Sequence, residues 1–597
     1  MNAGLIFAAT CLAVSMAEAQ APIAISVDAS VPGTPLKPVW SYHGYDEANY
    51  TTMAAGSTLL RDIKAFNPES VFVRTHFLLN SGDGTAALKW GSTNVYSEDA
   101  QGRPVYDFRI LDGIMDSIVA AGAYPLAEIA FMPQALSAHP DPYKPSGTYA
   151  LDGGAFQPPN DYGKWAGLIS AWAAHAKARY PGMERAWPWE LWNEPDIGYW
   201  HGTHAEYLKL FDYTEKALHA ILPQAVLGGP EVTSGGTGMM KEFLDHCAKG
   251  TNATGGQGTR LDMVTFHAKG GVAMTAGHIR MDLGSQMRQH RNLFSLIAGY
   301  PEFRGKPIVI GEADPDGCAA CPASQVPADG YRNVPAYGAY EAAMMKHSLD
   351  LADSLKVNLR GLVTWAWTFP GSPYFSGYRE LANGGIHKPV LEAFKMLAHL
   401  RGSRIPVKSA GARGLAGILT DGVRGTPDVD GLAAKDKDRV AVLLWNYHDD
   451  LTAADPVAVR LTLKLPAGFP AQAKLTHYRM DSTHSNAYTA WLAMGGPQTP
   501  SAAQLAQLRS AMALQTLETP RAVDAGSGTL SLDFSLPRHA LSLILVESAV
   551  PSGIARPALT GIPVVRRGGW DVCDIRGRKF KAGNPARPGT RRNGIPL

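Results

Sequence analysis

Two segments of the chain carry a glutamate at the end of an apolar run. Residues 187–196 read Trp-Pro-Trp-Glu-Leu-Trp-Asn-Glu-Pro-Asp, and residues 307–314 read Pro-Ile-Val-Ile-Gly-Glu-Ala-Asp. Each run predicts a buried strand, and Pro195, which has no backbone N–H to give to a sheet, ends the first strand directly after Glu194. We therefore expect the carboxylates of Glu194 and Glu312 to point into one bowl at the carboxyl ends of parallel strands.

Two carboxylates placed across a sugar ring are the minimal apparatus for hydrolysing a glycosidic bond. One protonates the departing oxygen, and the other attacks the anomeric carbon or activates a water molecule. Because Trp192 and Trp200 flank Glu194, we expect loss of solvation to hold its proton near neutral pH, as a general acid requires. Gly311 is expected to allow a close approach of backbone or ligand beside Glu312. A lone glutamate is usually a loop or N-cap residue, so this interpretation depends on the presence of both glutamates.

Alternating strand-like and helix-like segments position the two glutamates. The predicted strands are 40–44, 71–76, 123–132, 187–194, 225–232, 263–268, 307–314 and 362–369. The predicted helices include 108–121, 162–180, 204–222, 282–297, 337–355 and 389–400. Strands that alternate with helices predict a parallel sheet, and eight such units predict an α/β fold, a (β/α)₈ TIM barrel over residues 39–400.

The pattern changes after residue 400. Apolar residues alternate with polar ones over 457–465, 530–536 and 541–545, which predicts half-buried antiparallel strands and an accessory β-sandwich domain over 401–550. We expect residues 22–38 to add an N-terminal strand to this sandwich. Residues 551–597 are rich in Arg, Gly and Pro, which predicts a basic, disordered tail.

Composition and targeting signals indicate a compartment. The chain has 597 residues and a net charge of +2, which gives no indication of a nucleic-acid or membrane partner. Residues 1–21 resemble a secretory signal peptide, so we expect a periplasmic or secreted protein. In an oxidising compartment Cys318 and Cys321 are expected to form a disulfide on the rim of the site. A zinc site is the alternative, but a second Cys/His pair with ligand spacing is missing.

Motifs along the predicted barrel resemble glycoside hydrolase family 39, the β-xylosidase and α-L-iduronidase family. The resemblance covers about residues 22–550. The matching segments are Arg74-Thr75-His76, Glu128-Ile129-Ala130-Phe131-Met132-Pro133, Leu191-Trp192-Asn193-Glu194-Pro195, Gly228-Gly229-Pro230, His267-Ala268, Glu312, Trp367-Thr368-Phe369, and residues 481–491. Two positions depart from many relatives: Lys269 stands where they have tyrosine, and Ala313-Asp314 follows Glu312 where they have an aromatic residue.

The resemblance implies a role for each candidate residue. Glu194 is the implied acid/base and Glu312 the implied nucleophile, about 5–5.5 Å apart. Substrate-binding roles are implied for His76, Asn193 and His267, with Asn193 on the 2-hydroxyl. A core histidine is the alternative for each imidazole.

Trp367 is the implied sugar platform, for which Trp365 competes and barrel packing is the alternative. The resemblance also implies a cis peptide bond between Trp367 and Thr368.

These expectations define an exported retaining exo-glycosidase. We expect a β-xylosidase that releases xylose from xylo-oligosaccharides by double displacement. The alternatives are the same mechanism on another glycone, such as an α-L-arabinofuranoside or a glucoside, and a carbohydrate-binding protein without catalysis. An iduronidase would need a basic clamp for the substrate carboxylate, to which Lys269 could contribute. No metal or organic cofactor is implied; the expected partner is an oligosaccharide, and an oligomer is compatible with the sequence.

Overall fold

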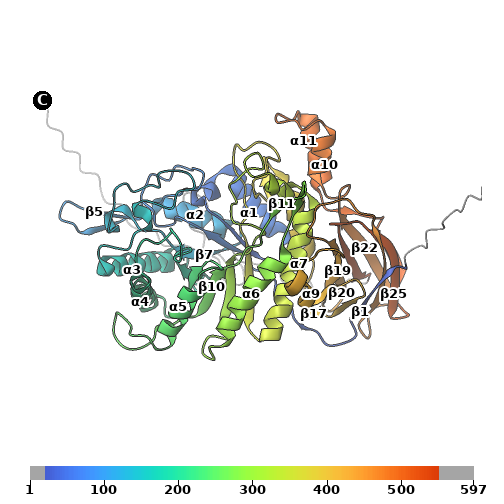
Figure 1. The fold of residues 1–597 in the computed structure, drawn as a ribbon, viewed down its shortest axis with the longest axis horizontal. Coiled ribbons are helices and arrows are strands. Elements are labelled where there is room, and N and C mark those ends of the chain that lie inside the picture. Colours follow the sequence, from blue (N-terminus) through green and yellow to red (C-terminus); the bar gives the residue numbers. More distant parts are fainter. Residues whose placement is uncertain (1–20, 550–597) are drawn as a thin grey trace, which may run out of the picture.

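A closed barrel of eight parallel strands forms the larger part of the molecule (Figure 1). The computed structural model describes residues 21–549, so the predicted basic tail and all but the last residue of the predicted signal peptide lie outside the described part. Around the barrel the strand order is β10-β13-β14-β3-β4-β7-β8-β9. In chain order these strands are β3 (Tyr42–Tyr45), β4 (Phe72–Thr75), β7 (Tyr124–Ile129), β8 (Pro188–Leu191), β9 (Val226–Val232), β10 (Met263–His267), β13 (Pro307–Glu312) and β14 (Asn358–Thr364). The (β/α)₈ fold class predicted from the sequence is confirmed.

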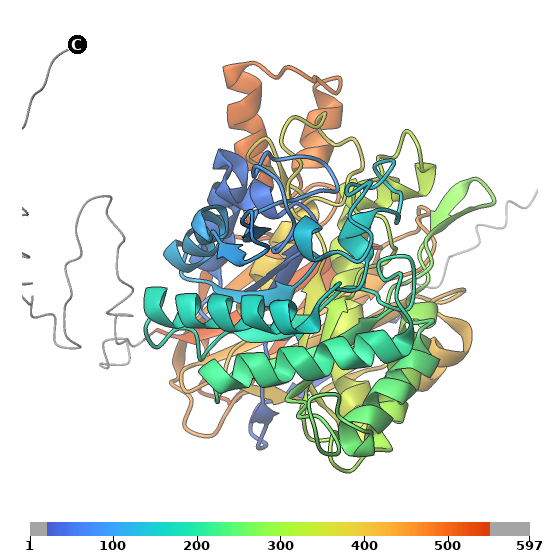
Figure 2. The ribbon, with the colours of Figure 1, turned by 90° about the vertical axis from the view of Figure 1, so that its left-hand side faces the viewer.

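Helices surround the barrel, and Figure 2 shows two of them, α3 and α4, running side by side across one flank. The barrel helices are α1 (Ala54–Phe66), α2 (Arg109–Ala120), α3 (Tyr162–Arg179), α4 (His204–Ile221), α5 (Thr237–Lys249), α6 (Leu283–Ala298), α7 (Pro335–Leu355) and α8 (Pro389–Leu397). Helix α3 buries the apolar face that its periodicity predicts, Trp165, Leu168, Ile169 and Trp172. No helix within residues 21–549 is both long enough and apolar enough to cross a bilayer.

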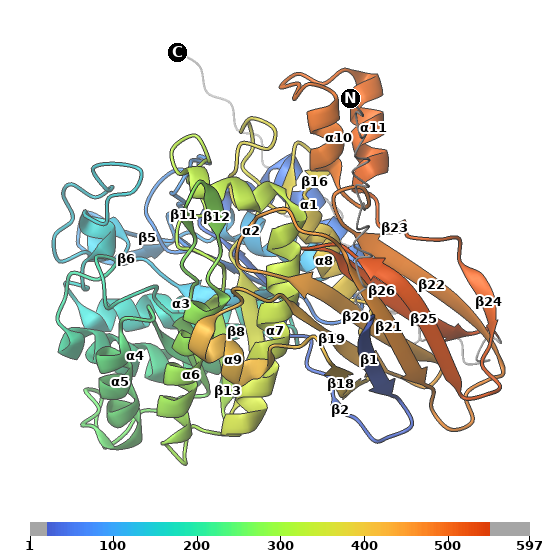
Figure 3. The same ribbon diagram turned by 45° about the vertical axis from the view of Figure 1, so that its right-hand side comes forward.

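The accessory domain consists of two sheets packed face to face (Figure 3). The smaller sheet has the order β18 (Val407–Ser409), β1 (Ile23–Asp28), β21 (Val457–Lys464) and β25 (Thr529–Leu536). The larger sheet comprises β2 (Thr34–Pro35), β17 (Ser403–Ile405), β19 (Asp428–Lys435), β20 (Arg439–Tyr447), β26 (Leu541–Ser548), β22 (Gln472–Met480) and β23 (Gln515–Thr516), with β24 (Arg521–Asp524) paired to β22. The N-terminal strand β1 therefore lies inside a sheet built from the C-terminal part of the chain.

Shorter elements complete the described chain. Helices α9 (Gly414–Asp421), α10 (Ala487–Ala493) and α11 (Ala502–Met512) belong to the accessory domain, and α10 and α11 stand side by side at one edge of the molecule (Figure 1). Three hairpins project from the barrel loops: β5 (Tyr96–Glu98) with β6 (Pro104–Tyr106), β11 (Ala273–Thr275) with β12 (His278–Arg280), and β15 (Ala382–Asn383) with β16 (Ile386–His387). Four short 3₁₀ turns, at 48–52, 134–136, 154–156 and 327–333, lie in barrel loops.

The larger sheet is buried on both faces. One face contacts the smaller sheet, and side chains of the other face, including Leu443 and Trp445, join the core of the barrel domain. Ion pairs cross the same boundary, since Lys346 of α7 contacts Asp430 at 2.7 Å and His347 contacts Asp428 at 3.1 Å. The sandwich thus packs directly against the barrel domain. Strand β20 is buried along its whole length, so it has no polar face from which the sequence would predict a strand.

The eighth barrel strand differs from its prediction. Residues 362–369 were expected, but β14 begins at Asn358 and ends at Thr364. The ladder stops there because the backbone N–H of Trp365 donates to Asp314 Oδ2 at 2.8 Å instead of to a neighbouring strand. Trp365 and Trp367 consequently lie in the loop that follows the strand.

Candidate active site

Glu194 lies in a tight turn directly after β8. Its φ is +41° and that of Trp192 is +72°, which non-glycine residues rarely adopt. The turn is held by the N–H of Glu194, which donates to the carbonyl of Glu231 at 2.9 Å, and by the indole N–H of Trp192, which donates to the carbonyl of Tyr199 at 2.7 Å. Backbone strain of this kind persists only where the surroundings enforce it, and here it aims the Glu194 carboxylate into the barrel mouth.

Glu312, the last residue of β13, faces Glu194 across the ammonium of Lys269. Lys269 Nζ lies 2.7 Å from Glu312 Oε2 and 3.1 Å from Glu194 Oε1. Carboxylate oxygens of both glutamates and a ring nitrogen of His267 lie within 4.8 Å of one another. The structure therefore brings together the two glutamates singled out in the sequence, and adds a lysine between them.

The charges around Glu312 keep it ionised. Burial alone would raise the pKa of the Glu312 carboxyl, but the cations Lys269, His267 and His76 outweigh it and hold that pKa well below its usual value. His76 Nε2 lies 3.5 Å from Glu312 Oε1, whereas Lys269 contacts Oε2. An ionised carboxylate at this position is suited to nucleophilic attack.

The predicted rise in the pKa of Glu194 is wrong in direction. Burial against indoles raises the pKa of Glu194, as expected, but Lys269 and His267 oppose it and the pKa falls to about 2. Proximity to tryptophan was visible in the sequence, whereas the two cations come from β10 and the loop after it. Glu194 therefore holds its proton only if a ligand displaces Lys269 or if His267 passes a proton to it.

His267 is placed to hold that proton. Its Nδ1 lies 2.8 Å from Glu194 Oε1 and its Nε2 lies 2.8 Å from Glu231 Oε2. Burial would lower the pKa of His267, but Glu312, Glu194 and Glu231 raise it to about 9. A protonated imidazole in direct contact with Glu194 supplies a proton for general-acid work without help from bulk water.

A buried layer of charge supports the two carboxylates from below. Arg74 of β4 is fully buried and contacts Glu190 and, at 3.0 Å, Glu128. It also lies 3.7 Å from Glu231 and 3.9 Å from Glu312. These partners fix the guanidinium in place. Arg74 thereby links its own strand, β4, to glutamates of β7, β8, β9 and β13 beneath the site.

Glu190 and Glu231 were not identified in the sequence as functional residues. Burial raises the pKa of Glu190 well above its usual value; Arg74 opposes this rise and Glu231 reinforces it. The pKa of Glu231 falls to about 2, because Arg74 and His267 outweigh its burial. The one available signal was a charged residue inside an apolar strand. Gly311 is the residue that makes room, because a Cβ there would lie 2.3 Å from Glu231 Oε2.

Asn193 and His76 both face the site. Arg74 Nη2 donates to Asn193 Oδ1 at 3.3 Å, and the buried Nδ2 of Asn193 has no hydrogen-bond partner among residues 21–549. His76 Nδ1 contacts Glu128 Oε2 at 2.7 Å, which leaves Nε2 directed at the carboxylates. An unpartnered buried donor is costly unless a ligand satisfies it, so Asn193 is available for a substrate hydroxyl.

The tryptophan beside the catalytic residues is Trp365. Its ring lies 4.4 Å from that of His76 and 5.0 Å from the guanidinium carbon of Arg74. The ring of Trp367 instead stacks on that of Tyr45, with their centroids 4.1 Å apart, and is buried. This placement fits the alternative role of packing within the barrel. The predicted cis bond after Trp367 is wrong: that bond is trans, and the non-proline cis bond of the described chain joins Ala130 to Phe131.

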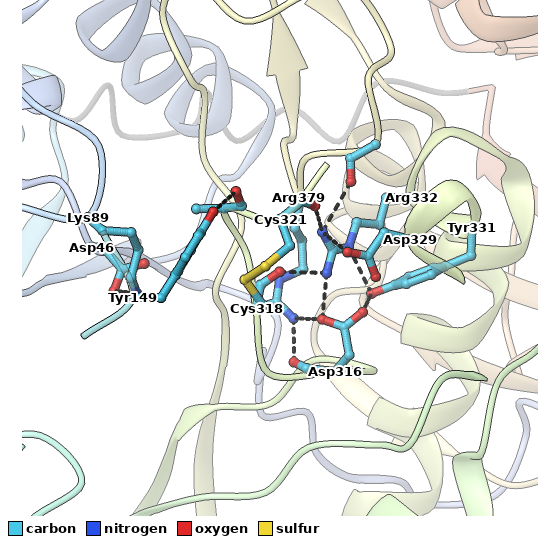
Figure 4. The surroundings of a disulfide bond; sticks show 12 residues. Asp46, Lys89, Tyr149, Asp316, Cys318, Cys321, Asp329, Tyr331, Arg332 and Arg379 are labelled. Carbon is cyan, nitrogen blue, oxygen red and sulfur yellow. Dashed lines mark hydrogen bonds and ion pairs between the residues drawn. A yellow bond between two sulfur atoms is a disulfide. The ribbon is translucent and has the colours of Figure 1, made fainter. Parts of the chain in front are cut away.

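A disulfide-bonded loop borders the site after β13 (Figure 4). Cys318 and Cys321 are joined as predicted, with their Cα atoms 5.6 Å apart. The guanidinium of Arg332 donates to the carbonyls of both, at 2.6 and 2.9 Å, and to Asp316 Oδ1 at 2.7 Å. Arg379 binds the same Asp316 oxygen at 3.0 Å, so the loop is anchored to buried charge.

The donor set of Glu194, His267 and Glu312 has the spacing of a metal site. Lys269 already occupies the position between the two carboxylates, so a cation would have to displace its ammonium. The same holds for His347, Asp428 and Asp430, where Lys346 contacts Asp430.

A parallel (β/α)₈ barrel that places one glutamate directly after β8 and a second at the end of β13 has the catalytic arrangement of a glycoside hydrolase. The chain belongs to glycosyl hydrolases family 39, whose family model matches residues 23–530.

Named relatives fall into two groups. A β-xylosidase of Geobacillus stearothermophilus is 26% identical over 80% of this chain and 86% of its own. An α-L-iduronidase of Mus musculus is 28% identical over 91% of this chain and 83% of its own. Among solved structures, a monomeric β-xylosidase from Caulobacter crescentus superposes with a TM-score of 0.70 at 23% identity, covering 88% of this chain and 100% of its own. A bacterial orthologue of human α-L-iduronidase reaches 0.72 at 22% identity, covering 93% and 88%. These superpositions establish the shared fold.

Proposed function

We propose that the chain is a retaining exo-glycosidase with Glu312 as nucleophile and Glu194 as acid/base. The observation that carries this proposal is the proximity of the two carboxylates: one oxygen of Glu194 lies within 4.8 Å of one oxygen of Glu312, and the Lys269 ammonium contacts both groups. Retaining enzymes hold their carboxyl groups about 5–5.5 Å apart, whereas inverting enzymes leave about 6.5–9.5 Å for a water molecule. The low pKa of Glu312 supports its role as the attacking group.

The charge arrangement supports a double displacement. Glu312 attacks the anomeric carbon and forms a glycosyl ester while Glu194 gives its proton to the departing oxygen. Glu194, then ionised, takes a proton from a water molecule that attacks the ester and releases the sugar with its configuration retained. The proton of the first step is supplied through His267, whose Nδ1 is 2.8 Å from Glu194, and Asn193 Nδ2 binds the 2-hydroxyl.

The glycone we propose first is a β-xyloside, taken from xylo-oligosaccharides. It is the expectation from the sequence, and the β-xylosidase relatives support it. Export to the periplasm or medium belongs to the same proposal, and the Cys318–Cys321 disulfide supports an oxidising compartment.

Lys269 favours a second candidate, an α-L-iduronide. Xylose and iduronic acid share a six-membered ring and differ by a carboxylate on C5. A substrate carboxylate would draw Lys269 away from Glu194, which would then regain the raised pKa that its burial dictates. A neutral xyloside gives Lys269 no such partner, so the ammonium makes the anionic sugar the better match to the acid step. The iduronidase relatives support this reading.

The test is a panel of aryl glycosides. Turnover of β-xyloside, α-L-iduronide, α-L-arabinofuranoside and β-glucoside is compared for the unmodified protein and for Lys269→Met. A uronidase loses iduronide turnover in the variant, whereas a xylosidase keeps most of its xyloside turnover. Proton NMR of the first sugar released reads its configuration, and an inverted product would refute the retaining mechanism. No turnover on any glycoside would favour a binding protein.

A further inference from the structure

Asp46 and Lys89 form an ion pair beside the catalytic centre that none of the roles above uses. Asp46 follows β3, and its Oδ1 lies 2.9 Å from Lys89 Nζ. The same oxygen is 3.4 Å from Nε2 of His76, which in turn is 3.5 Å from Glu312 Oε1. The pair is therefore separated from the nucleophile by a single imidazole.

The position of Lys89 is enforced by its surroundings. Its φ is +54°, a left-handed conformation that is unfavourable for lysine. Its backbone N–H donates to Glu47 Oε1 at 2.7 Å, and Glu47 is buried. The Asp46 side chain is 3% exposed and that of Lys89 18%, so Lys89 is the more exposed member of the pair. A lysine that served only solubility would need neither the backbone conformation nor the buried partner.

The pair and Lys269 are associated with different oxygens of the nucleophile. Lys269 contacts Oε2 of Glu312, whereas His76, with Asp46 behind it, approaches Oε1. Tyr149 stands beside Asp46 and Lys89 in Figure 4, and its hydroxyl donates to the carbonyl of Ala320 in the disulfide loop at 2.8 Å. This bridge joins two loops next to the pair.

We propose that Asp46 and Lys89 bind two adjacent hydroxyls of the terminal sugar, on the part of the ring remote from the scissile bond. Asp46 accepts a hydrogen bond from one hydroxyl, and Lys89 donates to its neighbour. A hydroxyl both donates and accepts, so a carboxylate next to an ammonium matches a diol, and ionised partners make such bonds stronger than neutral ones. The inference rests on the proposed function and deepens it. Because xylose and iduronic acid both carry ring hydroxyls, the pair selects for the free diol and not between the two sugars.

Binding of sugar-shaped amines tests this proposal independently of catalysis. The probes are a trihydroxypiperidine, whose ammonium is attracted to Glu194 and Glu312, and its three analogues that each lack one hydroxyl. Calorimetry on the unmodified protein needs no variant. We expect the triol to bind about 10- to 100-fold more tightly than the analogues lacking either hydroxyl of the diol, the range for losing a hydrogen bond to a charged group.

Variants then assign the hydroxyls to the pair. In Lys89→Met and Asp46→Asn, the affinity for the triol should exceed that for the analogue lacking the contacted hydroxyl by only a few-fold. The affinity of that analogue should be the same for each variant as for the unmodified protein. The matched control is Lys144→Met, an exposed lysine above Trp90 that has no role in the site. Thermal unfolding verifies that each variant is folded.

Several outcomes would overturn the proposal. Equal weakening of all four probes in the variants would assign the pair a structural role only. Equal affinity of the unmodified protein for the triol and every analogue, or no binding of any, would also refute it. If the probes discriminate as expected but no glycoside is hydrolysed, the diol site stands and the proposed function fails.

Discussion

Replacing Lys269 by methionine should shift the pH dependence of catalysis upward. The pKa of Glu194 is about 2, against an ordinary value of 4.5, because Lys269 and His267 outweigh its burial. That difference corresponds to about 3 kcal/mol in favour of the ionised form. Burial raises this pKa, and Lys269 is the largest contribution that lowers it, so removing the ammonium lets burial dominate.

The two limbs of the pH profile report different groups. The acid step needs one proton on the hydrogen-bonded pair of Glu194 and His267, so loss of that shared proton sets the alkaline limb of the kcat/KM profile. Glu312 must be ionised, so its pKa sets the acid limb. Lys269 lowers the pKa values of Glu194 and Glu312, and its loss raises both. We expect both limbs to move to higher pH, the alkaline one by about one to two pH units, since Lys269 supplies only part of the opposition to burial.

The assay is kcat/KM for a neutral aryl glycoside over about pH 3 to 11, a range that includes loss of the proton shared by Glu194 and His267. Lys249→Met is the control, because Lys249 is 79% exposed on α5 and distant in sequence and contact from the site. Carbon NMR of labelled glutamate carboxyls gives the two pKa values directly. An unchanged profile in Lys269→Met, or one that moves to lower pH, would refute the reasoning from charge.

Three further predictions concern named groups. Glu312→Ala should abolish turnover, and azide should rescue Glu194→Ala with a glycosyl azide of retained configuration, whereas Glu312→Ala with azide should give the inverted product; product NMR checks this, and exchanged outcomes would exchange the roles. Mass spectrometry without reductant should find Cys318 and Cys321 linked, and their reduction should lower the free energy of unfolding by about 2 kcal/mol or less, since the closed loop is short. Arg332→Ala should lower that free energy by about 1–3 kcal/mol in urea titrations, because the carbonyls of Cys318 and Cys321 lose their donor while Asp316 keeps only Arg379 as a guanidinium partner; an unchanged free energy would contradict this.

The parts of the molecule that could be predicted from the sequence are those with a local signature. Strands with one exposed face, such as β21, alternate visibly, and Glu194 and Glu312 each end an apolar run. By contrast β19 and β20 are buried on both faces and show no alternation. Their place in the larger sheet depends on contacts with the barrel, which a local pattern does not contain.

The chemistry of the site was predicted in its residues but not in its charges. Trp192 and Trp200 suggested a raised pKa for Glu194, and burial does act in that direction. The reversal comes from His267 and Lys269, which are more than seventy positions away and meet Glu194 only after the barrel closes. The choice between Trp365 and Trp367 likewise depended on where β14 ends, which the side chain of Asp314 decides.

The placement of β1 has a consequence for the order of synthesis. The hydrogen bond between Lys464 and Asp28 spans 436 residues, and β1 pairs along its length with β21. At about 5–20 residues per second, the first strand leaves the ribosome roughly 20–90 s before its partner. During that interval β1 is a strand without a sheet, open on both edges to pairing with other chains. A chain halted after the barrel would keep that open strand, because residues 407–409 and 457–464, which cover the two edges of β1, would be missing. A stable fragment limited to the barrel must therefore omit β1 as well as the sandwich strands.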